Sequence, residues 1–387
     1  MTETSGPRGR IALIKSVDQG ALDLLSPGFV HQMSECLDCR ACEAVCPSAV
    51  PYGQMLETMR ARIEDAAAPA RPALQRAERG LLLEWLFARP GRLRTAARLL
   101  RFAQRSGLDR LAGLFGLQAA AALAPRIPED FFVADDQRYT VSHAEGTAML
   151  HAGCVMPVLF AGVHDATIRM LNRARLSVVV PAAQGCCGAI AVHAGDDRFA
   201  RDLAKINIAA FESSGADVYV VNAAGCGAAL KEYGRWLEDD PAWAARAAAF
   251  SSRVRDVSEV LDAMELTAAP VRIERRVTYQ EACHLVHAQR VSAAPRRLLA
   301  KIPGLQFVEM RESAVCCGSA GVYNLTQPDM AQRLGRRKLE NIERTGAEIV
   351  VTANPGCALQ VGAGLREARS GAKVMHLVEL LDQAYTA

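Results

Sequence analysis

Residues 215–226 read GADVYVVNAAGC, and residues 346–357 repeat this stretch as GAEIVVTANPGC. In each copy, a short apolar run rich in Val is followed within a few residues by a cysteine. Such a run, bounded by glycine and polar residues, predicts a short buried strand that ends in a turn. Since the two cysteines lie 131 residues apart (357 − 226), the repeated stretch indicates a duplicated domain with one such strand in each half.

Eight of the twelve cysteines follow this duplicated layout. Each half contains a single cysteine, then a Cys-Cys-Gly triplet, then a last cysteine. The first set is Cys154, Cys186, Cys187 and Cys226, and the second set is Cys283, Cys316, Cys317 and Cys357. One isolated cysteine is most simply a small buried apolar side chain. Eight cysteines in a repeated pattern favour metal or cluster binding, or a redox-active thiol group.

Predicted strands and helices alternate in both halves. The predicted strands are 147–151, 176–180, 217–221, 276–280, 306–309 and 348–352, and the helices between them include 159–174, 199–213 and 330–344. This alternation predicts parallel sheets with helices on their faces. Each cysteine or cysteine pair follows the carboxyl end of a strand, where open α/β sheets bind their ligands. We therefore expect the four thiols of each half to meet, with Gly188 and Gly318 allowing the unusual turn after each cysteine pair.

A different cysteine motif precedes the two halves. Residues 35–53 read ECLDCRACEAVCPSAVPYG, in which Cys36, Cys39, Cys42 and Cys46 have the spacing C-x2-C-x2-C-x3-C-P. This is the bacterial ferredoxin run of a [4Fe–4S] cluster, whereas zinc knuckles pair two C-x2-C units across a longer spacer. In two-cluster ferredoxins, the fourth cysteine of such a run binds the other cluster. Cys46 therefore either completes its own cluster or belongs with a second run, and this sequence contains only one.

Composition excludes several classes of protein. The chain has 387 residues, of which 50% are hydrophobic and 22% charged, so it is neither disordered nor fibrous. Its longest weakly polar run, 148–163, contains His151 and Pro157 and is too short to span a bilayer. Because no secretory signal is visible, we expect a cytoplasmic protein with reduced thiols. The net charge of +3 favours neither nucleic acid nor membrane as a partner.

The segment between the two kinds of cysteine motif is predicted to be helical, over 54–66, 74–87 and 93–105. From Arg60 to Arg110 there are 12 arginines and 5 acidic residues, a local balance of +7 (12 − 5). In the last predicted helix, arginines form one face and apolar residues another: Arg94, Arg98, Arg101 and Arg105 against Leu93, Ala96, Ala97 and Leu100. Such a helix suits an anionic membrane surface, although a solvated or partner-facing helix is the commoner case.

Three histidines lie near the cysteine motifs, namely His193, His284 and His287. Imidazole could bind a cluster or donate a hydrogen bond to it. Because these histidines have no matching positions in both halves, we interpret them as structural.

The order of these motifs resembles that of the iron–sulfur subunits of bacterial glycolate oxidases. The wider CCG-domain group includes components of heterodisulfide reductases and of anaerobic glycerol-3-phosphate dehydrogenases, together with lactate-utilisation proteins. The resemblance rests on PRGRIALIK at 7–15, CLDCRACEAVCPSAVPYG at 36–53, GCGAALKEYG at 225–234, EACHLVHAQ at 281–289, CCGSAGVYNL at 316–325 and NPGCALQ at 354–360.

The chain departs from the related patterns in two places. In the glycolate oxidase family, a first ferredoxin run normally precedes the PRGRI segment, but here Met1 stands only six residues before Pro7. We expect either a gene start placed too far downstream or a truncated chain. In heterodisulfide reductases each CCG domain ends in C-x-x-C, whereas Ala229 and Gln360 occupy these last positions here. The four remaining thiols per domain suit a cubic [4Fe–4S] cluster or a zinc ion.

The resemblance implies a mixed α/β fold with four parts. These are a mainly helical ferredoxin-like [4Fe–4S] part over 1–53, a helical Arg-rich linker over 54–140, and two duplicated α/β CCG domains with parallel sheets over 141–265 and 266–387.

The function that the resemblance implies is electron transfer within a complex that oxidises glycolate to glyoxylate. FAD-containing subunits would oxidise the substrate, and this chain would pass electrons to a quinone or another acceptor, with possible peripheral contact to the membrane. No GxGxxG fingerprint follows a predicted strand, and we assign no catalytic residue. The alternatives are the equivalent subunit for lactate or glycerol-3-phosphate oxidation, and a zinc-binding or metal-free scaffold.

Overall fold

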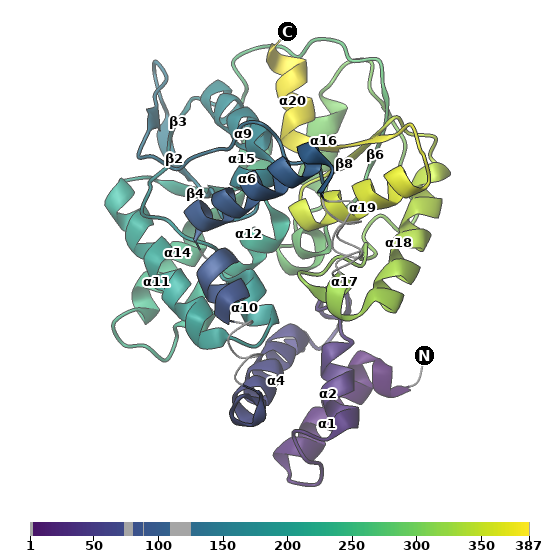
Figure 1. The fold of residues 1–387 in the computed structure, drawn as a ribbon. Helices are drawn as coiled ribbons and strands as arrows, with labels where there is room; N and C mark the ends of the chain where they lie inside the picture. Colours follow the sequence, from purple (N-terminus) through teal and green to yellow (C-terminus); the bar gives the residue numbers. More distant parts are fainter. Residues whose placement is uncertain (1–2, 73–79, 88, 109–124, 387) are drawn as a thin grey trace.

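A computed structural model of the chain describes residues 3–72, 80–87, 89–108 and 125–386 (Figure 1). A small helical part at the N-terminus lies below two α/β units that stand side by side. The fold is therefore mixed α/β with a duplicated α/β portion, as the sequence predicts.

The N-terminal part is a small bundle of helices with a core of its own. Its main elements are α1 (Pro7–Asp18), α2 (Pro27–Ser34), α3 (Ala41–Ala44) and α4 (Tyr52–Ala67), flanked by the short 3-10 helices η1 (Glu3–Ser5) and η2 (Ala68–Ala70). Phe29 and Met33 of α2 pack against Tyr52 and Leu56 of α4. The cysteine run 36–46 is therefore held between two helices that share a core.

The first α/β domain contains a five-stranded sheet in the order β1-β3-β2-β4-β5. The strands are β1 (Arg138–Tyr139), β2 (Gly146–Leu150), β3 (Leu176–Val179), β4 (Val218–Val221) and β5 (Val254–Asp256). Neighbouring strands are parallel except β1, which pairs antiparallel with β3 at the edge. The predicted strands 147–151, 176–180 and 217–221 are thus confirmed, and β1 and β5 are additional.

Eight helices accompany this sheet in the part of the domain that the structure describes. They are α8 (Met156–Leu159), α9 (Ala161–Arg173), α10 (Ala189–His193), α11 (Asp197–Ser214), α12 (Ala224–Lys231), α13 (Tyr233–Trp236), α14 (Ala244–Arg253) and α15 (Val257–Ala263). The predicted helix 159–174 is interrupted at Phe160, so that a short helix precedes the main one.

The second α/β domain repeats the arrangement with a parallel sheet in the order β7-β6-β8-β9. Its strands are β6 (Arg276–Tyr279), β7 (Gln306–Phe307), β8 (Ile349–Thr352) and β9 (Lys373–His376). Its helices are the π-helix η5 (His284–Ala288), α16 (Ala293–Ala300), α17 (Tyr323–Thr326), α18 (Pro328–Glu343), α19 (Pro355–Glu367) and α20 (Leu377–Thr386). Because β7-β6-β8-β9 matches β3-β2-β4-β5 position by position, the duplication holds at the level of topology.

Each domain contributes a helix that packs on a helix of the other domain. The last helix of the chain, α20, packs on α9 of the first domain, and α15 of the first domain packs on α16 of the second. The same pair of charges recurs at both contacts: Arg169 binds Asp382, and Arg297 binds Asp262. One continuous hydrophobic core includes residues of both domains. The carboxyl ends of the two sheets are consequently held against each other.

The basic helix predicted over 93–105 is α6 (Pro90–Ser106), which follows the π-helix η3 (Leu81–Phe87). Ala97 on its apolar face packs with Ile127 and Val158, and α6 crosses in front of the junction between the two domains (Figure 1). Residues 74–79 of the other predicted helix lie outside the described residues. Among the described helices, none has the length and apolarity required to cross a membrane.

Candidate metal-cluster site

The carboxyl ends of both sheets open into one cavity of about 490 Å³ between the two domains. Leu93 and Leu100 of α6 cover part of it, and Leu37 of the ferredoxin-type run reaches its wall. The cavity is lined by all eight cysteines of the duplicated pattern: Cys154, Cys186, Cys187, Cys226, Cys283, Cys316, Cys317 and Cys357. The structure thus places at one edge the thiols that the strand pattern predicts to meet.

The first set forms a continuous row of thiols. Cys154 Sγ lies 3.6 Å from Cys186 Sγ, and Cys187 shares hydrogen bonds with Cys186 and with Cys226. Cys186 and Cys187 both face the cavity because the chain turns at Gly188, which has a φ of +80°. A Cβ atom there would also lie 3.3 Å from the backbone of Ala200. The predicted role of this glycine is confirmed.

The second set is arranged in the same way. Cys316 shares hydrogen bonds with Cys283 and Cys317, and Cys317 shares one with Cys357. Gly318 has a φ of +90°, and its amide N–H donates to Cys316 Sγ over 3.4 Å. A buried ammonium group, Lys338 Nζ, interacts electrostatically with all four thiols. A positive charge so close to a buried site suits a set of thiolates.

The chemistry of the thiols fits a bound metal cluster. Hydrogen bonding with Cys186 and then burial hold the pKa of Cys154 well above the ordinary thiol value, and hydrogen bonding with Cys317 and then burial do the same for Cys357. Hydrogen bonds from Cys154 and Cys187 instead hold the pKa of Cys186 well below it. Three of the four thiols in each set are buried, and thiols so close together cannot all ionise without positive charge beside them. Since metal ligation requires thiolates, the positive charge of a metal core would allow this donor set to ionise.

The ferredoxin-type run bends tightly beside the cavity. Asp38 and Arg40 have left-handed backbone angles, with φ values of 52° and 60°, and these curl the loop around its cysteines. Burial, with smaller contributions from the neighbouring thiols of Cys283, Cys36 and Cys42, raises the pKa of Cys39 to about 12. Cys283 belongs to the second domain, so the two groups of cysteines are adjacent in space. Cys46 lies farther along, in the exposed turn after α3.

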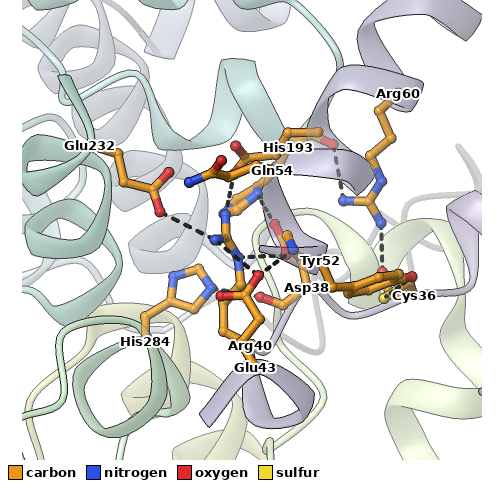
Figure 2. A network of polar contacts seen from close by, with 12 residues as sticks. Cys36, Asp38, Arg40, Glu43, Tyr52, Gln54, Arg60, His193, Glu232 and His284 are labelled. Carbon is orange, nitrogen blue, oxygen red and sulfur yellow. Dashed lines mark hydrogen bonds and ion pairs between the residues drawn. The ribbon is translucent and has the colours of Figure 1, made fainter. Parts of the chain in front are cut away.

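A buried charge network fixes this loop to the first domain (Figure 2). The guanidinium of Arg40 donates to Asp38 Oδ1 over 2.8 Å, to Glu57 Oε1 over 2.7 Å and to Glu232 Oε1 over 3.2 Å. Arg235 completes the network by binding Glu57 and Glu232 over 2.6 and 2.9 Å. Sequence reasoning missed this network because its members lie up to 197 positions apart (235 − 38). The only local signals are Asp38 and Arg40, the charged residues between the cysteines.

The three histidines near the motifs hold backbone and side chains together. His193 Nδ1 lies 3.1 Å from Asp38 Oδ2, and His284 Nε2 lies 2.9 Å from the carbonyl oxygen of Asp38. His287 Nε2 lies 3.2 Å from the carbonyl oxygen of Ala314. Burial, and then the neighbouring His193, lower the pKa of His284 to about 4, which keeps that ring neutral. These contacts agree with a structural role and tie the ferredoxin-type loop to both domains.

The sequence analysis did not identify His151 as a residue of this site. His151 follows β2 directly and lines the cavity beside Cys187 and Cys226. The repeat gives no signal for His151, because the corresponding residue of the second half is Gln280.

Comparison with known proteins decides the family. The family described as "Cysteine-rich domain" (CCG) matches residues 148–231 and 277–362, and "Glycolate oxidase iron-sulfur subunit, linker region" matches residues 74–123. The probable glycolate oxidase iron–sulfur subunit of Bacillus subtilis (strain 168) is 38% identical over 99% of this chain and 88% of its own length. The chain belongs to the family of glycolate oxidase iron–sulfur subunits.

Other members and relatives of this glycolate oxidase subunit family agree with the assignment. The glycolate oxidase iron–sulfur subunit of Escherichia coli (strain K12) is 32% identical, again over 99% of this chain and 88% of its own length. Lactate utilization protein A of an Exiguobacterium strain is 29% identical but matches 60% of this chain. The linker match coincides with the Arg-rich segment, and the two CCG matches coincide with the duplicated domains.

Proposed function

We propose that this chain is the iron–sulfur, electron-transfer subunit of a glycolate oxidase complex. FAD-containing subunits of the complex oxidise glycolate to glyoxylate, and this chain conducts their electrons toward a quinone or another acceptor. Family membership supports the reaction. The observation that carries the relay role is the convergence of all eight CCG cysteines on one cavity, with Cys39 adjacent to Cys283.

The cysteines supply the ligands in this proposal. Cys36, Cys39, Cys42 and Cys46 bind a [4Fe–4S] cluster, and each CCG set of four binds a further metal cluster. Bound clusters of this kind accept and release single electrons. The chain provides burial and hydrogen bonds to sulfur, such as those from Tyr52 Oη to Cys36 Sγ and from the Gly318 amide to Cys316 Sγ. Both kinds of contact tune reduction potentials.

The substrate and the acceptor are part of the proposal. Lactate is the alternative substrate, but the lactate-utilisation relative matches much less of the chain than the glycolate oxidase subunits do. We place the subunit on the cytoplasmic side of the membrane, with α6 as its peripheral contact. On this helix Leu99 and Phe102 are two-thirds exposed, and the side chain of Arg98 is exposed beside them.

A cysteine substitution tests the relay. In the anaerobically purified complex, Cys39→Ser should remove one cluster signal from the EPR spectrum. Glycolate should still reduce the flavin, while reduction of a quinone analogue should be largely lost, because a cluster of the relay loses a ligand. The control is Ser48→Ala, at an exposed position of the same loop. Undiminished quinone reduction in Cys39→Ser would overturn the relay role.

A further inference from the structure

We propose that His151 is a metal ligand in the first CCG domain, so that this domain binds its cluster through both thiolate and imidazole, whereas the second domain uses thiolates alone. The inference rests on the proposed function, because it requires a cluster held by the thiols of the first domain.

The position of the ring supports ligation. His151 is 2% exposed, and its Nδ1 lies 2.8 Å from the hydroxyl oxygen of Tyr219. One ring nitrogen of His151 and the Sγ atoms of Cys187 and Cys226 all lie within 4.8 Å of one another. Since Nδ1 is engaged by Tyr219, the nitrogen available to a metal is Nε2. Three donors at this separation can bind one metal atom.

The second ring nitrogen of His151 faces the thiols. Nε2 is buried and has no nitrogen or oxygen partner among the described residues, and the ring interacts with the thiol of Cys226 instead. A metal ion bound there would satisfy the lone pair of this buried nitrogen. When Nδ1–H donates to Tyr219, the lone pair of Nε2 is directed away from that contact, and metal-binding histidines generally have such a partner on their second nitrogen. The ring of Tyr219 is itself fixed by Phe211 and Phe250.

The second domain lacks this donor. Gln280 stands three residues before Cys283, as His151 stands three residues before Cys154. Both ends of the Gln280 amide are occupied, since its nitrogen donates to the Glu281 carbonyl over 2.6 Å and its oxygen accepts from Thr352 over 2.7 Å.

A second pair of matched residues agrees with this asymmetry. In the first domain Gly153 precedes the first cysteine, and a Cβ atom on it would lie 3.3 Å from His151 Nε2. The second domain has Ala282 at this position. The glycine of the first domain therefore leaves space for the imidazole of His151, whereas the second domain has a methyl group at the matched position.

A neutral imidazole has a consequence for electron flow. It contributes no negative charge to the cluster, unlike a thiolate, and histidine ligation in place of cysteine raises reduction potentials. A first-domain cluster on which His151 takes the place of one thiolate would therefore have a higher potential than the same cluster held by four thiolates.

Isotope labelling tests the assignment without altering the protein. The complex is prepared anaerobically with natural-abundance histidine or with 15N-histidine, reduced with dithionite, and studied by pulsed EPR. We expect one strongly coupled 14N signal that is replaced by 15N upon labelling. His151→Gln, which installs the residue of the second domain, should remove this signal and lower one midpoint potential. Gln280→Ala, at the matched position, should change neither.

The outcomes separate this inference from the proposed function. If clusters are present and glycolate reduces them, but no histidine nitrogen is coupled, the His151 assignment fails and the relay stands. A nitrogen coupling that persists in His151→Gln also overturns the assignment. If the complex contains no iron and no acid-labile sulfide, both the assignment and the proposed function fail.

Discussion

Arg40 is the residue at which three parts of the molecule meet. Its side chain is 6% exposed and contacts carboxylates from the ferredoxin-type loop, from α4 and from the first CCG domain. Burial alone would lower the pKa of this guanidinium, but Asp38, Glu57 and Glu232 raise it, so the group stays charged. The position of the N-terminal cysteines relative to the cavity depends on this cation.

Replacing Arg40 should destabilise the N-terminal part. Arg40→Met leaves buried carboxylates without their cation, which costs about 3–5 kcal/mol when one partner of a buried pair is removed. Denaturant unfolding of the anaerobic protein measures the loss. Arg62→Met is the control, because Arg62 pairs with Asp18 on the surface and such pairs contribute about 0–1 kcal/mol. Equal stability of the two variants would contradict the central role of Arg40.

The side chain of Arg40 leaves no space for a side chain at position 53, which is a glycine. A Cβ atom at Gly53 would lie 1.9 Å from Arg40 Nε, and Arg40 cannot move without breaking its ion pairs. We expect Gly53→Ala to cost about 2 kcal/mol or more, in the range of overpacked sites. Gly28→Ala, where nothing lies within 4 Å of the added atom, should be neutral or stabilising in α2. Thermal unfolding of the two variants compares them directly, and a Gly53→Ala protein as stable as Gly28→Ala would refute the close contact.

At the scale of elements, α15 begins with a buried carboxyl group. Asp256 accepts a hydrogen bond from the Ser258 amide over 2.9 Å, and its own amide donates to Glu259 Oε2 over 2.8 Å. This capping box satisfies the free amides at the start of the helix. Burial nevertheless raises the pKa of Asp256 from 3.8 to about 6. Burial therefore favours the protonated group in the folded state, although the hydrogen bonds from Ser258 favour the carboxylate.

The capping carboxyl predicts a pH dependence. Because the folded pKa lies above the unfolded one, the folded protein binds the proton more tightly, and stability falls as the pH rises through 6. From pH 5 to 7.5 this group should cost about 1.4 kcal/mol. In Asp256→Asn that share of the pH dependence should disappear. Urea unfolding of the unsubstituted protein and of Asp256→Asn at the two pH values measures this difference. An identical pH dependence of stability in the two proteins would show that the pKa of Asp256 is not raised by folding.

The elements that were predicted are those whose signal is local. Strands β4 and β8 are continuous apolar runs, and their repetition revealed the duplication. Strands β1, β5 and β9 were not predicted. β1 and β5 have only two or three residues, three of the five being charged, and β9 has four residues with a polar one at each end, so none shows a clear periodicity. The eight cavity cysteines were found through their repeat. The roles of Arg40 and His151 were not predicted. Arg40 contacts residues that are distant in the sequence, and His151 has no matching histidine in the other half. The division of the chain at residues 53, 140 and 265 stays a proposal.

At the scale of the whole molecule, the two CCG domains depend on each other's helices. Leu261 of α15 and Leu381 of α20 occupy matching positions, one residue before Asp262 and Asp382. Both are fully buried in the core that the domains share. The two domains should therefore unfold as one cooperative unit.

Matched core substitutions test this cooperativity. Leu261→Ala and Leu381→Ala should each cost about 2–5 kcal/mol, the range for large-to-small changes in a packed core. Hydrogen exchange should show that each variant lowers protection in both domains. Loss of protection confined to the domain that carries the substitution would mean that the domains are independent.

We propose that thiolates of this chain hold iron–sulfur clusters through which glycolate-derived electrons leave the flavin. The most direct measurement is freeze-quench EPR of the anaerobically purified complex after mixing with glycolate, with iron and acid-labile sulfide quantified in the same sample. Both elements should be present in quantity, and the cluster signals should appear before the acceptor is reduced. Zinc without sulfide, or clusters that stay oxidised while the acceptor is reduced, would contradict it.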